Sequence, residues 1–173
     1  MDNEKEHESV MDTTKYGKFI ITDTEFPPIH PRTKESYQFN TLWIHEKMEG
    51  DLKDAFYLET NLVRFPGHTE PQTKPHKHDF DEYIIFMGTN PDDPQDLCGE
   101  VEFWLGGDEK HILTRTCAIF IPRGMYHCPF TFTRVDRPIV FVTTGTANSY
   151  VQSGFSNDPQ WAHLAEGHGA QGP

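Results

Sequence analysis

A short segment near the middle of the chain combines imidazole and carboxylate groups at a spacing that suits a metal ion. His76 and His78 are two residues apart, and Glu82 follows four residues after His78. Side chains alternate along a β-strand, so both histidines point to one face, and Glu82 shares that face if the strand continues without a bulge. We expect these three groups to line one wall of an interior.

A fourth ligand has to come from another part of the chain. The segment PRGMYH, residues 122–127, offers His127 just after a Pro-x-Gly turn, which can bring this histidine into a facing strand. Imidazole and carboxylate ligands together suit divalent Fe, Mn, Ni, Co, Cu or Zn. A calcium site would need more oxygen ligands, and a structural zinc site would commonly use thiolates. The residues therefore predict one transition-metal site.

The elements around these residues are short apolar runs separated by turn residues. Thirteen Gly and thirteen Pro are scattered along the chain, and 13% of the residues are aromatic, which favours an all-β protein over a helical bundle. Gly106 and Gly107 predict a tight hairpin, because glycine adopts the positive φ angles that such a turn needs. Short helices are expected at residues 48–56 and 158–166. The expected strands lie within residues 37–46, 55–65, 83–87, 100–105, 111–115, 117–121, 125–133 and 137–145.

The length of 173 residues suits a single domain. Residues 1–15 are polar and charged without periodicity, and residues 161–173 are rich in glycine and other small residues. We therefore expect a β-barrel domain over residues 16–160, between a disordered N-terminal tail and a flexible C-terminal tail.

Charge and composition exclude several kinds of partner. The chain has 15 Lys and Arg against 27 Asp and Glu, a net charge of −12, so its surface would repel nucleic acid. It has no apolar stretch of roughly 20 residues to cross a membrane and no apolar signal core, so we expect a cytoplasmic protein. Cys98, Cys117 and Cys128 are odd in number and lack CxxC spacing, which predicts reduced thiols.

Two motifs, HxHxxxE and then PxGxxH, follow each other along the chain and resemble those of the cupin superfamily. The resemblance covers about residues 60–145. It implies an all-β double-stranded β-helix, a jelly-roll-like barrel of two antiparallel sheets with short peripheral helices. Inside it, three histidines and one glutamate would bind the metal and leave positions for substrate or water. The first motif, HxHxxxE and a following glycine, is His76, His78, Glu82 and Gly88, and the second, PxGxxH, is Pro122, Gly124 and His127.

The resemblance leaves the chemistry open, because the superfamily includes dioxygenases, isomerases, decarboxylases, dehydratases and non-catalytic binders. We expect a metal-dependent enzyme that acts on a small polar organic molecule, with dioxygenase-like oxidation slightly favoured over isomerase, dehydratase or decarboxylase chemistry. Fe²⁺ or Mn²⁺ is the favoured cofactor, with Zn²⁺, Ni²⁺ and Cu²⁺ as alternatives. The alternative function is a non-catalytic small-ligand or sugar-binding protein with a structural metal. The resemblance and the surplus apolar strand faces also predict a homodimer.

Three residues are candidates for a substrate pocket. Arg64 is flanked by apolar residues and, if it faces inward, needs a carboxylate partner, which a substrate could provide. Thr131 has the same parity as His127 along its expected strand, and Tyr126 directly precedes that histidine. Each also has a simpler explanation: a surface arginine, a hydroxyl bonded to the backbone and a packed aromatic ring.

Overall fold

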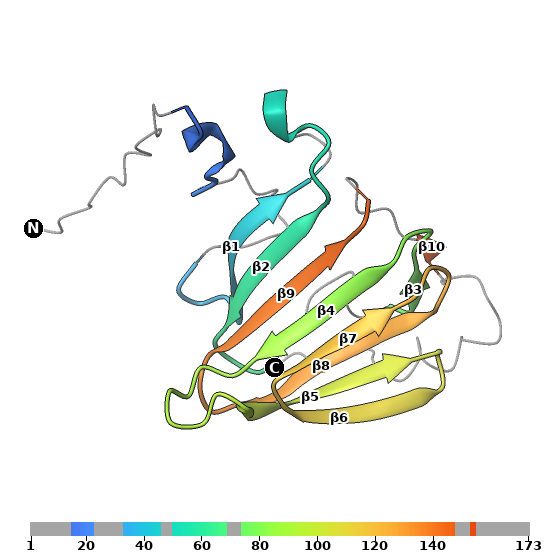
Figure 1. Cartoon of the computed structure of the whole chain (residues 1–173). Coiled ribbons are helices and arrows are strands. Elements are labelled where there is room, and N and C mark those ends of the chain that lie inside the picture. The colour runs from blue at the N-terminus through green and yellow to red at the C-terminus, as the bar shows by residue number, and fades with distance from the viewer. Residues whose placement is uncertain (1–14, 23–32, 46–49, 69–73, 148–152, 155–173) are drawn as a thin grey trace, which may run out of the picture.

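The structure is a computed structural model that describes residues 15–22, 33–45, 50–68, 74–147 and 153–154. These residues form ten strands and two short 3₁₀-helices (Figure 1). The helices are η1 (Gly17–Phe19) and η2 (Gly50–Leu52). The strands are β1 (Gln38–Ile44), β2 (Leu58–Val63), β3 (His76–Lys77), β4 (Glu82–Met87), β5 (Asp96–Leu105), β6 (Glu109–Arg115), β7 (Cys117–Ile121), β8 (His127–Val135), β9 (Ile139–Gly145) and β10 (Ser153–Gly154).

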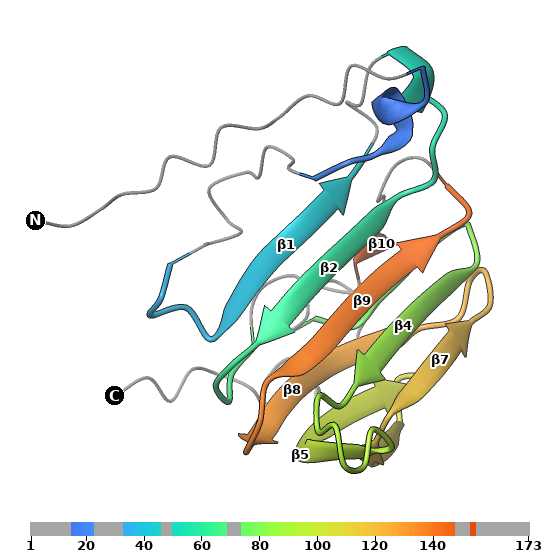
Figure 2. The same cartoon turned by 60° about the vertical axis from the view of Figure 1, so that its left-hand side comes forward.

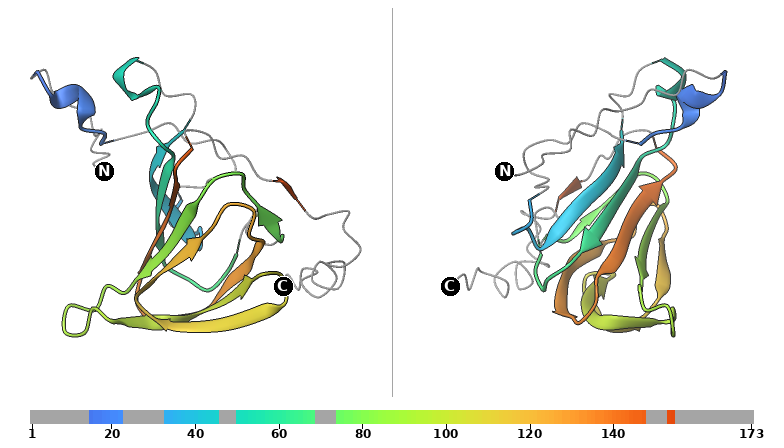
Figure 3. Two further views of the ribbon diagram at one scale, coloured as in Figure 1. Left: turned by 45° about the vertical axis from the view of Figure 1, so that its right-hand side comes forward. Right: turned by 90° about the vertical axis from the view of Figure 1, so that its left-hand side faces the viewer.

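The strands form two five-stranded antiparallel sheets, which the turned views show as separate layers (Figure 2, Figure 3). One sheet has the order β1-β2-β9-β4-β7 and the other β10-β3-β8-β5-β6. From β2 onward the chain crosses repeatedly between the sheets, so that strands distant in sequence become neighbours. This order is that of a double-stranded β-helix, and the expected fold class is confirmed.

Side-chain alternation along the strands builds the core between the sheets. On β4, Ile84 and Phe86 are buried, whereas Tyr83 and Met87 are exposed on the outer face. Burial of the inner faces of both sheets removes a large apolar area from water, which is the main favourable contribution to folding. The core contains a group of five phenylalanines from β4, β5, β8 and β9, namely Phe86, Phe103, Phe130, Phe132 and Phe141.

The predicted turn and helices have mixed outcomes. Gly106 and Gly107 have φ angles of 63° and 93° and join β5 to β6, so the predicted hairpin is confirmed. A helix was expected at residues 48–56, and in the described part of this segment the structure has only the three-residue 3₁₀-helix η2. The second expected helix, the C-terminal tail and nearly all of the N-terminal tail lie outside the described residues. No helix in the described part of the chain is long and apolar enough to span a membrane.

Candidate metal centre

The histidines and the glutamate of the two motifs come from opposite sheets. His76 opens β3 and pairs in register with His127, which opens β8 in the same sheet. Glu82 opens β4 in the other sheet. The condition under which Glu82 would share the face of the histidines, one continuous strand from His76 to Glu82, is not met, because β3 ends at Lys77 and the chain crosses between the sheets before Glu82. The crossover is short enough to leave all of these side chains in one buried cluster.

Three of the four predicted ligands converge on one point. Oε2 of Glu82 lies 3.1 Å from Nε2 of His127 and 3.4 Å from Nε2 of His78. All three side chains are buried, and their ligand atoms lie within 4.8 Å of one another. Within the described part of the chain, Nε2 of His127 and Oε2 of Glu82 make no hydrogen bond. Because buried polar atoms normally have partners, two such atoms facing each other fit a site for a cation.

Backbone carbonyls orient two of the imidazole rings. Nδ1 of His127 donates a hydrogen bond to the carbonyl of Met125 at 3.3 Å, and Nδ1 of His76 donates to that of Lys74 at 2.9 Å. A carbonyl oxygen can only accept, so in each neutral ring the proton is on Nδ1 and the lone pair on Nε2. This arrangement prepares Nε2 for a metal, as is usual for histidine ligands.

The second oxygen of Glu82 is held in place by two hydroxyl groups. Oε1 accepts hydrogen bonds from the hydroxyl of Tyr57 at 2.5 Å and from Oγ1 of Thr143 at 2.7 Å. Gly145 pairs with Glu82, and a Cβ atom there would lie 2.7 Å from the Tyr57 ring and 2.8 Å from the Phe80 ring. Only glycine therefore allows β9 to pass this close to the residues that position Glu82.

The protonation states favour a bound cation. Burial opposes the charge of Glu82, but the imidazoles of His127 and His78 beside it outweigh burial and hold the pKa of this carboxyl well below its usual range. Burial, followed by repulsion from His127, lowers the pKa of His76 to about 3. Burial and the charge of Glu82 raise the pKa of Tyr57, so this phenol remains a hydrogen-bond donor. At neutral pH the site holds an ionised carboxylate and a neutral His76.

His76 lies beside the convergent group rather than within it. Its ring centroid is 4.3 Å from that of His127 and 5.0 Å from that of His78. The ligand atoms of His76, His127 and Cys128 all lie within 4.8 Å of one another. The structure thus brings all four predicted ligands together and adds a cysteine that the motifs did not indicate.

Two of the three pocket candidates are turned away from Glu82. The guanidinium of Arg64 donates to the carbonyls of Thr33 and Ser36, the latter at 2.9 Å, and so fixes the segment before β1. The ammonium of Lys77 lies 4.5 Å from the centre of the Tyr126 ring. Lys77 is the residue between His76 and His78, so this contact is on the opposite face of the chain from the two histidines.

Thr131 does not share the face of His127, because β8 contains an extra residue between them. On β5, Phe103 and Leu105 are two residues apart, whereas their partners on β8, Phe130 and His127, are three apart. Such a bulge reverses the alternation of side chains. Phe130 lies in the core, and Thr131 therefore lies on the outer face of the sheet.

Tyr57, Thr143 and Cys128 were not predicted as parts of the site. Tyr57 and Thr143 are 25 and 61 residues from Glu82 in the sequence, so only the pairing of β2, β9 and β4 brings them to it. Cys128 directly follows a predicted ligand, but a strand without a bulge would have turned it to the other face. No local sequence signal marks any of the three.

Comparisons with known proteins find similar folds at low sequence identity. An uncharacterized conserved protein with a double-stranded beta-helix domain from Klebsiella pneumoniae is 12% identical, with a TM-score of 0.45 over 72% of this chain and 84% of that chain. An oxalate oxidase in complex with glycolate is 17% identical, with a TM-score of 0.46 over 75% of this chain and 63% of that chain. Oxalate decarboxylase from Bacillus subtilis is 11% identical, with a TM-score of 0.43 over 72% of this chain and 30% of that chain.

No protein-family model matches the chain, and no curated protein matches it. The assignment of the fold therefore depends on the strand order and on the motifs themselves. Both motifs lie where the two sheets bring their histidines and glutamate together. The chain has a double-stranded β-helix fold, and its two motifs, which resemble those of the cupin superfamily, meet at one buried cluster.

Proposed function

We propose that this chain is a metal-dependent cupin enzyme that acts on a small polar organic molecule. His76, His78, Glu82 and His127 would hold one Fe²⁺ or Mn²⁺ ion. The observation that carries the proposal is the pair of buried atoms, Nε2 of His127 and Oε2 of Glu82, that face each other at 3.1 Å without hydrogen bonds among the described residues. A bound ion would supply Lewis-acid polarisation of a substrate oxygen or, as iron, redox chemistry.

A row of polar side chains on the inner face of β1 and β2 supports a polar substrate. Gln38, Asn40 and Asn61 on β1 and β2 are buried, which is unusual for amides unless they are bonded. Oε1 of Glu59 accepts hydrogen bonds from the amides of Asn40 at 2.7 Å and Asn61 at 3.1 Å. Glu59 also pairs with Thr143, whose hydroxyl holds the carboxylate of Glu82. The row therefore reaches the proposed metal site.

The row is rich in acceptor oxygens, which favours a substrate with hydroxyl or amino donors. Oε1 of Gln38 is buried and makes no hydrogen bond within the described residues, so it is available to a donor on a ligand. The carboxylate of Glu59 would repel a substrate carboxylate placed beside it. A substrate acid group would therefore lie at the metal rather than along β1 and β2.

Glu82 is better suited to anchoring an ion than to acting as a base. Its Oε1 is committed to the hydroxyls of Tyr57 and Thr143, so displacement of the carboxylate would break both hydrogen bonds. Among the described residues, His45 is the one buried imidazole or carboxyl group outside the proposed ligand set, and it stacks on Trp43. With few groups to transfer protons, we place O₂-dependent oxidation ahead of isomerisation, dehydration and decarboxylation.

Elemental analysis of the purified chain tests the metal site. We expect near-stoichiometric iron or manganese in the wild type and its loss in His127→Ala and Glu82→Gln. His111→Ala on β6 is the matched control, because this partly exposed histidine pairs with Glu109 and belongs to no group of potential ligands among the described residues. Metal retained by His127→Ala, or absent from the wild type, would contradict the ligand assignment.

Activity is tested with the metal-loaded wild type and a panel of small hydroxy acids, polyols and amino alcohols. We expect one substrate class to be consumed together with O₂. Substrate turnover in anaerobic buffer would instead favour the isomerase, dehydratase or decarboxylase reactions. Tight binding without turnover under both conditions would favour the second candidate, a non-catalytic binder of sugar-like ligands. The small number of buried proton-transfer groups among the described residues also fits this candidate.

A further inference from the structure

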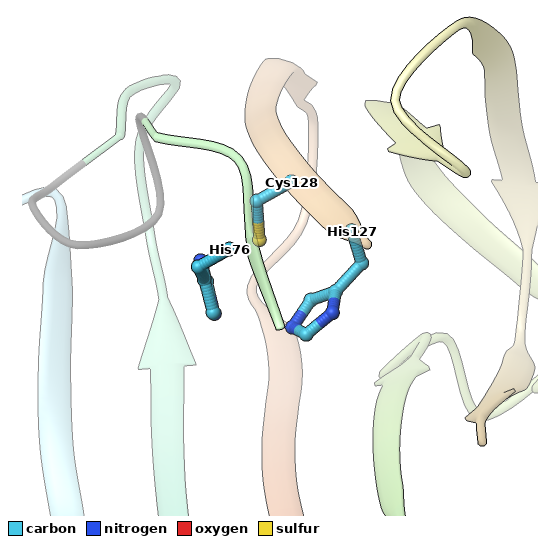
Figure 4. A group of neighbouring side chains, drawn as sticks. All are labelled: His76, His127 and Cys128. Carbon is cyan, nitrogen blue, oxygen red and sulfur yellow. The ribbon is translucent and has the colours of Figure 1, made fainter. Parts of the chain in front are cut away.

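A cysteine lies against the same cluster and forms a second group of potential ligands. The ligand atoms of His76, His127 and Cys128 lie within 4.8 Å of one another, and all three side chains are buried. Figure 4 shows the sulfur of Cys128 and the two imidazole rings grouped where β3 lies against the start of β8. The bulge at the start of β8 is what allows the adjacent residues His127 and Cys128 to contribute to one group.

The two groups differ in chemistry and share one residue. The first group, His78, Glu82 and His127, contains a carboxylate and suits Fe²⁺ or Mn²⁺. The group with Cys128 replaces the carboxylate by sulfur, which favours thiophilic ions such as Zn²⁺, Cu⁺ or Cd²⁺. Nε2 of His127 is buried and makes no hydrogen bond within the described residues, so this nitrogen is available to either group.

We propose that His76, His127 and Cys128 form a second coordination arrangement, which takes a thiophilic ion and excludes the ion held through Glu82. Binding forms a sulfur–metal bond, and the proton of the Cys128 thiol leaves to solvent. The two arrangements exclude each other because both use His127 and because His76 also belongs to the ligand set of the proposed function. The site would therefore respond to zinc or cadmium by losing the ion that its carboxylate arrangement holds.

Neither of the other cysteines offers this chemistry within the described residues. Cys98 and Cys117 are partly exposed and belong to no group of three potential ligands in the described ranges. Cys117 lies on β7, at the edge of the other sheet. Cys117→Ser is therefore the matched control for Cys128→Ser.

Cadmium titration of the metal-free full-length chain tests this proposal through the ultraviolet charge-transfer band of a thiolate–cadmium bond. We expect the band to saturate at one ion per chain, to persist in Cys117→Ser and Glu82→Gln, and to be lost in Cys128→Ser. Prior loading with Mn²⁺ should reduce the band, with release of Mn²⁺ as cadmium is added. Absence of the band from the wild type, its persistence in Cys128→Ser or its loss in Glu82→Gln would overturn the proposal.

Circular dichroism and thermal melting establish that each variant is folded. If Cys128→Ser does not fold, Cys128→Ala replaces it. If neither folds, the Glu82→Gln titration decides, because it keeps Cys128 and removes the carboxylate arrangement. This result is distinguishable from a failure of the proposed function: a chain that binds no iron or manganese can still show the thiolate band.

Discussion

The interior of the double-stranded β-helix has two contrasting ends that are built from the same strands. At one end, five phenylalanine rings pack with neighbouring centroids 5.3 to 6.2 Å apart. At the other end, Glu82, His78 and His127 gather beside Tyr57 and Thr143. Strand β4 carries Glu82 at one end and Phe86 near the other, and on β9 Thr143 and Phe141 are consecutive buried residues of the inner face.

The contrast teaches how stability and function are divided within single strands. The aromatic end gains free energy from apolar burial, which does not depend on exact direction. The polar end desolvates charged and polar groups and recovers only part of that cost through hydrogen bonds. Substitutions at the aromatic end should therefore change the free energy of unfolding, and substitutions at the polar end should change metal affinity.

Phe86→Ala should have the largest effect on folding. Removing a fully buried ring from the centre of the aromatic group should lower the free energy of unfolding by about 3–5 kcal/mol. The metal content of the remaining folded protein should not change, because the ligands lie at the other end of the strand. Urea unfolding followed by metal analysis of the folded fraction checks both. Metal loss from folded Phe86→Ala would show that the two ends are not separate.

Tyr57→Phe should mainly weaken metal binding. The variant removes one of the two hydroxyls that hold Oε1 of Glu82, and we expect metal affinity to fall by about 10–100-fold. Competition with a chelator measures the affinity. Tyr83→Phe is the control, because Tyr83 is exposed on the outer face of β4 and should keep wild-type affinity. Equal effects of the two substitutions would remove Tyr57 from the positioning role.

The metal-free protein should become more stable as the pH rises from about 3 to 6.5, which are the pKa of His76 in the folded protein and its ordinary value. Within this window the unfolded chain binds the proton and the folded chain does not, so stability rises by up to about 1.4 kcal/mol per pH unit. The lowered pKa of Glu82 acts with the same sign, but only below the usual carboxyl range.

Denaturant unfolding at a series of pH values measures this slope. His76→Gln should flatten the slope between the ordinary carboxyl and imidazole pKa values, whereas His111→Gln should not. A wild-type slope of the opposite sign in this range would mean that His76 is stabilised as a cation in the folded protein.

Thr131→Val should have the smallest effect. Thr131 lies on the outer face of β8, so we expect unchanged metal affinity and a change of within about 0.5 kcal/mol in the free energy of unfolding. Thr143→Val is its counterpart at the site and should weaken metal binding, because it removes the second hydroxyl from Glu82. Chelator competition on both variants makes the comparison, and lower affinity in Thr131→Val would place this residue inside after all.

The sequence predicted all described strands except the two-residue β3 and β10, and it marked the four proposed ligands, because both depend on short-range patterns. Apolar runs bounded by turns located β4, β7 and β9, and two motifs marked the histidines and Glu82. Resemblance to a known fold then supplied the pairing of the sheets, which spacing alone does not specify.

The details that sequence reasoning missed depend on long-range register. The crossover between β3 and β4 placed Glu82 in the opposite sheet from His76, although the ligands still met. The extra residue in β8 turned Thr131 outward and left Cys128 beside His127, and a bulge of this kind has no reliable sequence signal. Arg64 was a pocket candidate only if it faced inward, and its guanidinium instead donates to the backbone carbonyls of Thr33 and Ser36.

The placement of Glu82 and His127 on opposite sheets also bears on the slow opening of the molecule. An ion bound by both Glu82 and His127 would link the two sheets. Transient separation of β4 from β8 would then require release of the ion. By mass action, each tenfold rise in free metal above the dissociation constant would make such opening about tenfold rarer. Amide hydrogen exchange in these strands would then report the metal concentration around the protein.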